Sequence, residues 1–259
     1  MLPVIFSIGS FHLYSFSIFL ICSWMVWSFF FWRYLRNLAV REDTIFDIMF
    51  YTTMVSFFAS RTFYVVTHIP LFSDSWLKVV ALWVQPGLSF TGALIGGVIV
   101  SILLGLRYKV RIAYILDGLA HALSWSFLVA SIGSFLDGSV VGKITTLPWA
   151  VKFIGHIGTR HPIQLYEMLG MAVIIFICWR FRTMKTSILF FLLFATVMFL
   201  FEFLVESDVY WGSLSANQWL YIGIIGQAIG AFYVRGGGKE KLVRLGGIIY
   251  GKFSKRHLK

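Results

Sequence analysis

Two ionisable side chains stand inside apolar stretches of the chain, where charged groups are costly and are therefore functional candidates. Arg61 lies near the end of an apolar run over residues 46–66, and Glu202 lies within the sequence FLFEFL. The guanidinium of Arg61 could bind a lipid phosphate bidentately, or it could extend passively to the membrane interface. The carboxyl group of Glu202 could exchange a proton, or it could pair with Arg61 or a tyrosine hydroxyl. The residues alone leave both alternatives open.

The segment over residues 160–167 reads RHPIQLYE and leads into an apolar run over residues 165–180. Its proline suits the first turn of a helix, where a missing amide donor costs nothing. Gln164 and Glu167 are three residues apart and can share a helix face. His161 and Glu167 are six apart, which is not the spacing of metal ligands on a helix, so no metal is predicted. No cofactor is predicted for the chain either. The segment either caps the entrance to this helix or contributes side chains to a site.

The elements that hold these residues follow from the composition. The chain has 259 residues, of which 59% are hydrophobic and 13% are charged, and its mean hydropathy is +0.83. A soluble domain has about 25% charged residues, so a soluble enzyme, a disordered chain and a disulfide scaffold are excluded. A membrane-spanning helix needs about 20 mainly apolar residues. Seven runs of suitable length cover residues 14–32, 46–66, 88–106, 113–133, 165–180, 187–205 and 217–234.

Basic residues are placed unevenly among the connections between these runs. The net charge is +11, and 17 of the 22 lysines and arginines fall in four clusters that follow every second run. The clusters are Arg33, Arg36 and Arg41; Arg107, Lys109 and Arg111; Arg180, Arg182 and Lys185; and eight residues between 235 and 259. Because cytoplasmic loops carry an excess of lysine and arginine, the N-terminus is predicted outside and the C-terminus in the cytoplasm. Residues 1–235 then form an all-α transmembrane domain of about seven helices, and residues 236–259 form a basic cytoplasmic tail.

Two connections on the predicted outer side are long, over residues 67–87 and 134–164. They either form a cap over the outer ends of the helices or are ordinary interfacial connectors. Gly92, Gly96 and Gly97 form a stripe of small residues on the third apolar run, which favours close approach of a neighbouring helix. The basic residues lie in loops and a tail rather than on one continuous surface, so no nucleic-acid partner is predicted.

Five blocks of sequence, in this order, resemble the bacterial prolipoprotein diacylglyceryl transferase family. They are PVIFSIG with HLY at residues 3–14, LSFTGALIGG at 88–97, IGSFLDGSVVG at 132–142, RHPIQLYE at 160–167, and polar residues between 202 and 218. The resemblance implies seven spans in the bacterial cytoplasmic, or inner, membrane. It also implies an activity at the outer leaflet, which transfers the diacylglyceryl group of phosphatidylglycerol to the cysteine of a lipoprotein precursor. Phosphatidylglycerol and lipoprotein precursors are therefore the expected partners, with another membrane protein as an alternative.

Residues retained at the positions of the family's motifs supply the candidate site. Tyr14 is expected to donate a hydrogen bond, and His161 or Glu202 is expected to accept a proton. The expected lipid- and phosphate-binding residues are Arg61, Gly142, Gln164 and Glu167. Tyr166 and Gln218 are retained as well. Such a reaction requires a thiolate on the acceptor and a cation that holds the leaving phosphate.

The chain departs from the family mainly at positions where the family carries charge. Thr91 stands in place of a histidine, Ser131 and Met198 stand in place of arginines, and Ser139 stands in place of a glutamate. Removing one such donor from a catalytic site costs about 10²–10³ in rate. Two interpretations therefore stay open, and the sequence leaves undecided whether the chain is an enzyme. In the first interpretation, the chain is a diverged diacylglyceryl transferase. In the second, the chain is a non-catalytic paralogue that binds phospholipid or lipoprotein as a partner or regulatory subunit.

Overall fold

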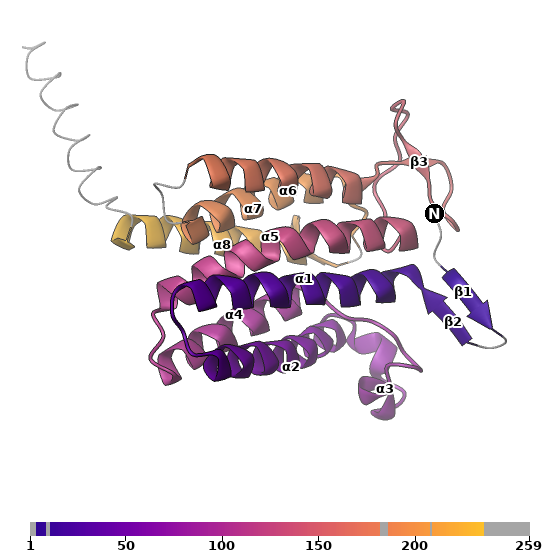
Figure 1. Cartoon of the computed structure of the whole chain (residues 1–259). Helices are drawn as coiled ribbons and strands as arrows, with labels where there is room; N and C mark the ends of the chain where they lie inside the picture. The colour runs from indigo at the N-terminus through magenta and orange to yellow at the C-terminus, as the bar shows by residue number, and fades with distance from the viewer. Residues whose placement is uncertain (1–3, 9–10, 182–185, 208, 236–259) are drawn as a thin grey trace, which may run out of the picture.

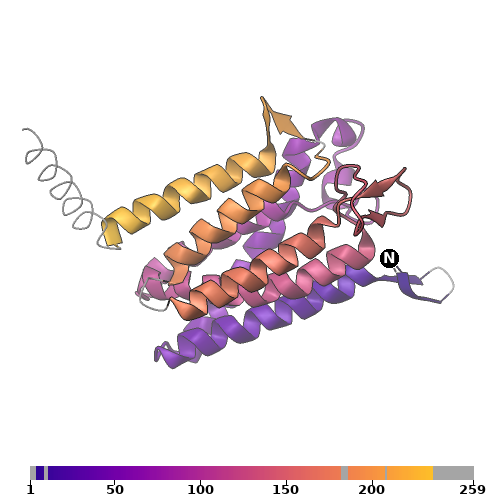
Figure 2. The same ribbon diagram turned by 90° about the horizontal axis from the view of Figure 1, so that it is seen from above.

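The computed structural model describes residues 4–8, 11–181, 186–207 and 209–235. Seven long helices account for most of this part of the chain and run roughly side by side (Figures 1 and 2). They are α1 (Ser15–Asn37), α2 (Glu42–Thr67), α4 (Phe90–Arg107), α5 (Ile112–Asp137), α6 (Ile163–Arg180), α7 (Thr186–Glu202) and α8 (Ala216–Arg235). Each coincides with one predicted apolar run, because a helix satisfies the backbone hydrogen bonds of an apolar stretch internally.

Several of these helices are suited to a membrane. Within the described ranges, α1, α4, α5 and α6 are long and apolar enough to cross a bilayer, whereas α7 is apolar but has 17 residues. Large apolar side chains such as Ile21, Phe58 and Leu169 point outward and are 61%, 65% and 62% exposed. An exterior of this kind is stable in lipid rather than in water. The prediction of a helical protein that crosses the membrane several times is confirmed, while a count of seven spans and their orientation stay predictions.

Side chains between the helices form two apolar clusters. One joins α1, α2 and α5 around Phe31, Ile45 and Ile115, whose side chains are fully buried. The other joins α4, α5, α6, α7 and α8 around buried residues that include Met171 and Phe194. Since α5 contributes to both clusters, it links the two halves of the bundle.

Short elements gather at one end of the bundle, which we call the cap end (Figures 1 and 2). Three antiparallel hairpins pair β1 (Val4–Ile8) with β2 (Phe11–Tyr14), β3 (Val151–Lys152) with β4 (Thr159–Arg160), and β5 (Tyr210–Trp211) with β6 (Leu214–Ser215). The helical turns η1 (Ile69–Phe72) and α3 (Leu77–Val80) lie there too. The fold is therefore not purely α-helical, because connections at the cap end pair their backbones. Both long connections predicted from the sequence contribute to this end, and the basic loops over residues 38–41 and 108–111 lie at the other.

The glycine stripe of α4 packs directly against α2, as predicted. A Cβ atom at Gly92 would lie 2.5 Å from the carbonyl oxygen of Ala59 and from the Cβ of Phe63. A Cβ atom at Gly96 would collide with the Cβ of Ala59. Glycine is therefore required here by the close approach of two helices, which small residues permit in membrane proteins.

Replacing Gly92 by alanine is expected to destabilise the α2–α4 pair by about 1–3 kcal/mol, the usual cost of overpacking a well-packed contact. The carbonyl of Ala59 belongs to a helix backbone and cannot rotate away from the added methyl group. Thermal unfolding of the detergent-solubilised protein measures the effect. Gly223→Ala in α8 is the matched control, because no described atom outside its own stretch of helix lies within 4 Å of its added Cβ. Equal unfolding temperatures for the two variants would contradict the assigned packing role.

Candidate functional site

Polar side chains from α4, α7 and the start of α8 meet at the cap end, and we call Thr91, Glu202, Ser215 and Asn217 the polar cluster. The Oε1 atom of Glu202 accepts hydrogen bonds from Ser215 Oγ at 2.8 Å and from Asn217 Nδ2 at 3.0 Å. Thr91 Oγ1 donates to Asn217 Oδ1 at 2.6 Å. Thr91, Glu202 and Ser215 are all buried. The donors that reach Glu202 are thus neutral groups, and the sequence-based alternative of pairing with Arg61 is not realised.

A capping box at the start of α8 fixes the geometry of this cluster. The backbone N–H of Gln218 donates to Ser215 Oγ at 3.2 Å, and the backbone N–H of Ser215 donates to Gln218 Oε1 at 2.9 Å. This reciprocal pair satisfies two amide donors that a helix start leaves without intrahelical partners. Gln218 therefore acts on the cluster through Ser215, which it contacts directly.

Glu167 lies beside Glu202 at the junction of α6 and α7. The rings of Tyr166 and Phe201, one residue before each carboxyl group, lie 6.1 Å apart. One turn deeper, a Cβ at Gly170 would contact Phe201 as well. The two carboxyl groups interact electrostatically, and neither takes part in an ion pair within the described residues. The two acidic groups thus lie near enough to influence one another, and within the described residues neither is paired with a side-chain cation.

Gln164 holds α6 against the end of α5 and the loop that follows it. Its side chain is fully buried, and its Nε2 atom donates to the carbonyl oxygens of Val140 at 2.7 Å and Ser134 at 3.4 Å. Among the described residues, the Oε1 atom of Gln164 and the Oγ atom of Ser131 are buried without a hydrogen-bond partner. Because α5 and α6 are antiparallel, Ser131 and Glu167 each lie one turn deeper than the Ser134–Gln164 contact. Ser131 therefore lies at about the level of Glu167.

The other retained residues lie at the cap end outside the polar cluster. His161 Nδ1 is 3.2 Å from Tyr166 Oη, which also accepts a hydrogen bond from Trp149 Nε1 at 2.7 Å. Gly142 is buried where its backbone pairs with the connection after α7, and an added Cβ would collide with His161. Tyr14 sits at the junction of β2 and α1 with its side chain half exposed.

Arg61 anchors the loop that follows α2. Its Nε, Nη1 and Nη2 atoms donate to the carbonyl oxygens of Val79 at 2.8 Å, Gly87 at 2.9 Å and Lys78 at 2.6 Å. The guanidinium also packs over the ring of Phe72 at 5.1 Å. Neither of the two sequence-based alternatives describes these contacts, because the side chain is turned into the protein. A role in phosphate binding stays a prediction.

Arg160 is the second arginine buried at the cap end. Its Nη1 atom donates to the carbonyl oxygen of Gly142 at 3.0 Å and forms an ion pair with Glu206. This contact links the loop after α5 to the connection after α7. The positive charge of Arg160 is therefore already balanced by a carboxylate of the same chain.

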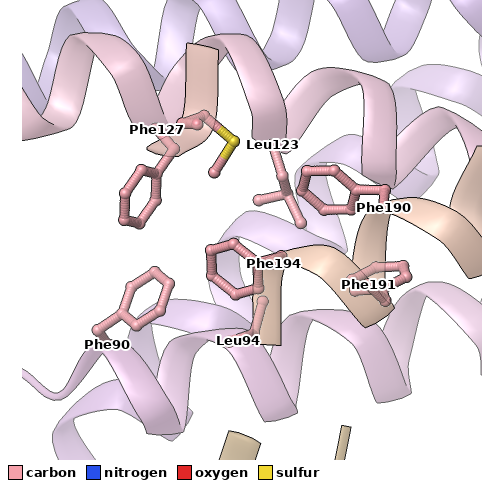
Figure 3. Close-up of a pocket in the computed structure, with 8 residues that line it drawn as sticks. Phe90, Leu94, Leu123, Phe127, Phe190, Phe191 and Phe194 are labelled. Carbon is pink, nitrogen blue, oxygen red and sulfur yellow. The ribbon is translucent and has the colours of Figure 1, made fainter. Parts of the chain in front are cut away.

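A small apolar pocket lies between α4, α5, α6 and α7 (Figure 3). Its lining begins at Phe90, next to Thr91 of the polar cluster, and continues deeper into the bundle. Its eight lining side chains are Phe90, Leu94, Leu123, Phe127, Met171, Phe190, Phe191 and Phe194. Residues four apart share a helix face, so the pocket-lining faces continue upward to Ser131 on α5 and Glu167 on α6. On α7, the same face continues through Met198 to Glu202. Polar groups thus stand on the cap-end side of an apolar interior.

Sequence reasoning missed two members of the polar cluster and one helix cap. The sequence motifs do not identify Ser215 and Asn217 as site residues. A Ser-x-x-Gln pattern before an apolar run is nevertheless a recognisable helix start. Asp117 lies within α5, and its Oδ1 atom accepts from the backbone N–H of Ser187 at 2.8 Å. It therefore caps the start of α7, a contact that no local pattern reveals.

Comparisons with known proteins place these residues in a wider context. The sequence profile of the family described as prolipoprotein diacylglyceryl transferase matches residues 3–234. A phosphatidylglycerol–prolipoprotein diacylglyceryl transferase of Wolbachia pipientis subsp. Culex pipiens is 27% identical over 240 residues, which cover 86% of this chain and 90% of the relative. Proteins of the same name from Bordetella parapertussis and Nitratidesulfovibrio vulgaris strain DP4 are 29% and 37% identical. These two alignments cover 69% and 56% of this chain, and 73% and 57% of the relatives.

Proposed function

The chain belongs to the prolipoprotein diacylglyceryl transferase family, and on this basis we propose that it binds phospholipid without transferring its diacylglyceryl group. The site faces the outer leaflet of the bacterial inner membrane. All seven long helices cross this membrane, with the N-terminus outside and the basic tail over residues 236–259, beyond the described part of the chain, in the cytoplasm. Phosphatidylglycerol, which the names of the relatives specify, is the reference ligand, and a lipoprotein precursor or a second membrane protein is the partner.

The observation that carries this proposal is the set of partners around the polar cluster. Transfer of a diacylglyceryl group releases a phosphate, whose negative charge needs a cation in the transition state. Here the positions of the family's charged groups hold Thr91, Ser131 and Met198, which carry no charge. The two arginines buried at the cap end are Arg61, turned to backbone carbonyls, and Arg160, paired with a carboxylate.

Retention of the lipid site is supported by the arrangement of polar and apolar groups. The polar cluster of α4, α7 and the start of α8 lies at the cap end, and the apolar pocket between α4, α5, α6 and α7 begins at Phe90, next to Thr91. The pocket encloses only about 10 Å³, so acyl chains would enter it only as these helices separate. A diacyl lipid has the matching order of a hydrogen-bonding head and apolar chains. Gln164 and Glu167 on α6 and Gly142 in the loop after α5 remain the lipid-binding candidates.

A second candidate function is a rearranged diacylglyceryl transfer. It is favoured by the contact of His161 with Tyr166 Oη at the cap end and by the buried carboxyl group of Glu202. In that case His161 or Glu202 would accept the thiol proton, Tyr14 would donate a hydrogen bond, and Arg61 would have to leave its carbonyl partners to hold the phosphate.

Complementation separates the two functions. The chain is expressed in bacterial cells depleted of their own transferase, and modification of a lipoprotein is followed by its gel mobility. We expect no rescue, although the protein is present in the membrane at the level of a relative that does rescue. Rescue would contradict the non-catalytic role and support the rearranged transfer.

A further inference from the structure

The connection between α2 and α4 presents a row of apolar side chains away from the protein. Trp76, Leu77, Val80 and Trp83 are 89%, 79%, 77% and 84% exposed, and we call these four residues the apolar edge. Ala81, in the same stretch, is buried. The connection therefore has an inner side that packs on the protein and an outer side that is almost entirely apolar.

Arg61 fixes the direction in which the apolar edge points. Its guanidinium donates to the carbonyl oxygens of Lys78 and Val79, which belong to α3, and to that of Gly87 near the start of α4. It also packs over the ring of Phe72. Because three charge-assisted hydrogen bonds from a buried side chain hold the backbone of this connection, the exposure of the apolar edge is built into the fold.

The position of the apolar edge indicates lipid as the surface that covers it. Figure 1 shows α3 beside the cap end of α2, at the side of the bundle, whereas the hairpin β1–β2 extends farther beyond the helix ends. The outward side chains Phe58, Val66 and Ile69 are 65%, 60% and 61% exposed and lead along α2 towards α3. Tryptophan is enriched where the hydrocarbon of a bilayer meets its head groups. The apolar edge thus continues the lipid-facing side of α2 at the level of this boundary.

The charges of the connection exclude electrostatic attraction as the reason for membrane contact. Residues 73–84 contain two charged side chains, Asp74 and Lys78, which form an ion pair with each other. The segment is therefore neutral, and it offers neither an anionic head group nor a charged protein surface a complementary charge. Burial of apolar side chains is the interaction that remains.

We propose that the apolar edge is an interfacial anchor, which inserts into the leaflet on the cap-end side beside α2, and that Arg61 is the positioning residue of this anchor. The anchor connects directly to α4, because Ser60 and Ser89 are joined by two hydrogen bonds of 2.9 and 3.2 Å. It therefore sets the level of the start of α4 relative to the lipid head groups. The inference goes beyond the proposed function and does not depend on lipid bound between the helices.

Spin labels on the full-length chain test the insertion. Cys22 and Cys178, the two cysteines of the chain, are replaced by serine, and a label is placed at Leu77→Cys or, as the matched control, at the exposed Ser73→Cys in the same connection. In phosphatidylcholine vesicles, we expect the label at 77 about 5–10 Å inside the boundary of head groups and acyl chains, in contact with oxygen. The label at 73 should instead meet a water-soluble nickel complex. Phosphatidylglycerol vesicles should give the same depths.

Two other outcomes would overturn the anchor. Equal access of the nickel complex to both labels would show that the apolar edge lies in water. A label at 77 that is shielded from oxygen and from nickel would show that protein covers the edge, either a second copy of the chain or another partner. Neither outcome bears on lipid binding between the helices, so the proposed function would stand.

Variants of Arg61 test the positioning role. Arg61→Met removes all three donors, so the label at 77 should move outward to the depth of the label at 73. Arg160→Met is the matched control, because it removes the other arginine buried at the cap end, which contacts Gly142 and Glu206 rather than the connection. An unchanged depth in folded Arg61→Met would contradict the role of Arg61. If this variant does not fold, Trp76→Ser combined with Trp83→Ser, which alters only exposed side chains, should move the label outward, and an unchanged depth there would overturn the anchor.

Discussion

The purified chain is expected to transfer diacylglyceryl groups at least about 10⁴-fold more slowly than a relative that retains the family's charged residues. Ser131 and Met198 stand at two positions where the resemblance to the family implies arginine. Each donor lost from a transition-state site typically costs about 10²–10³ in rate, and two such losses give this estimate. Met198 carries no charge, and it is 2% exposed within an apolar cluster. Its position therefore supplies no cation to the site.

The rate is measured with phosphatidylglycerol and a lipoprotein peptide that contains a single cysteine. The transferase of Nitratidesulfovibrio vulgaris provides the reference rate under the same conditions. A rate within tenfold of that reference would contradict the account, because it would require a cation that the described residues do not bring to the polar cluster.

Replacing Glu206 by alanine is expected to weaken the cap end by about 3 kcal/mol, because the change leaves the buried guanidinium of Arg160 without its carboxylate. Breaking a buried pair costs about 3–5 kcal/mol, and we take the lower value since the side chain of Glu206 is 54% exposed. Hydrogen exchange measures the effect locally. Amide protection of residues 141–143 and 204–206, whose backbones pair across this junction, should fall by about 100-fold.

Two further variants make this prediction specific. Arg160→Met should cost less than Glu206→Ala, because it leaves a carboxylate that water can reach rather than a buried cation. Glu42→Ala breaks a pair with Arg36 in which both side chains are about half exposed, and a loss below about 1 kcal/mol is expected. Equal losses for Glu206→Ala and Glu42→Ala would show that burial of Arg160 does not determine the strength of this contact.

The sequence is sufficient to predict the helices. It also predicts that the basic loops over residues 38–41 and 108–111 share one end of the bundle. Long apolar runs satisfy their backbone hydrogen bonds only as helices in lipid, so seven runs gave seven helices with boundaries within several residues. The packing role of Gly92 and Gly96 was predictable for a similar reason, since small residues at helical spacing permit close approach. The hairpins at the cap end were not predicted, because their short strands lack a periodic pattern.

The partners of the candidate residues were less predictable, since they come from distant parts of the chain. Arg61 is bound by carbonyl oxygens 17, 18 and 26 positions away, and backbone acceptors leave no signature in a sequence. Thr91 and Asn217 are 126 positions apart. Helical periodicity indicates which face of a helix a residue occupies, whereas the pairing of faces depends on how the whole bundle packs.

Retention of phospholipid by the pocket tests the central claim most directly, and two leucines of α4 provide a matched pair of variants. Leu94 lines the pocket and is 9% exposed, whereas Leu103 lies on an outward face and is 58% exposed. Phospholipid that co-purifies with each variant is quantified by native mass spectrometry, with thermal unfolding as a check on folding. The account predicts that Leu94→Trp loses the bound lipid and that Leu103→Trp keeps it. Equal lipid content in two folded variants would contradict the claim that a phospholipid binds between α4, α5, α6 and α7.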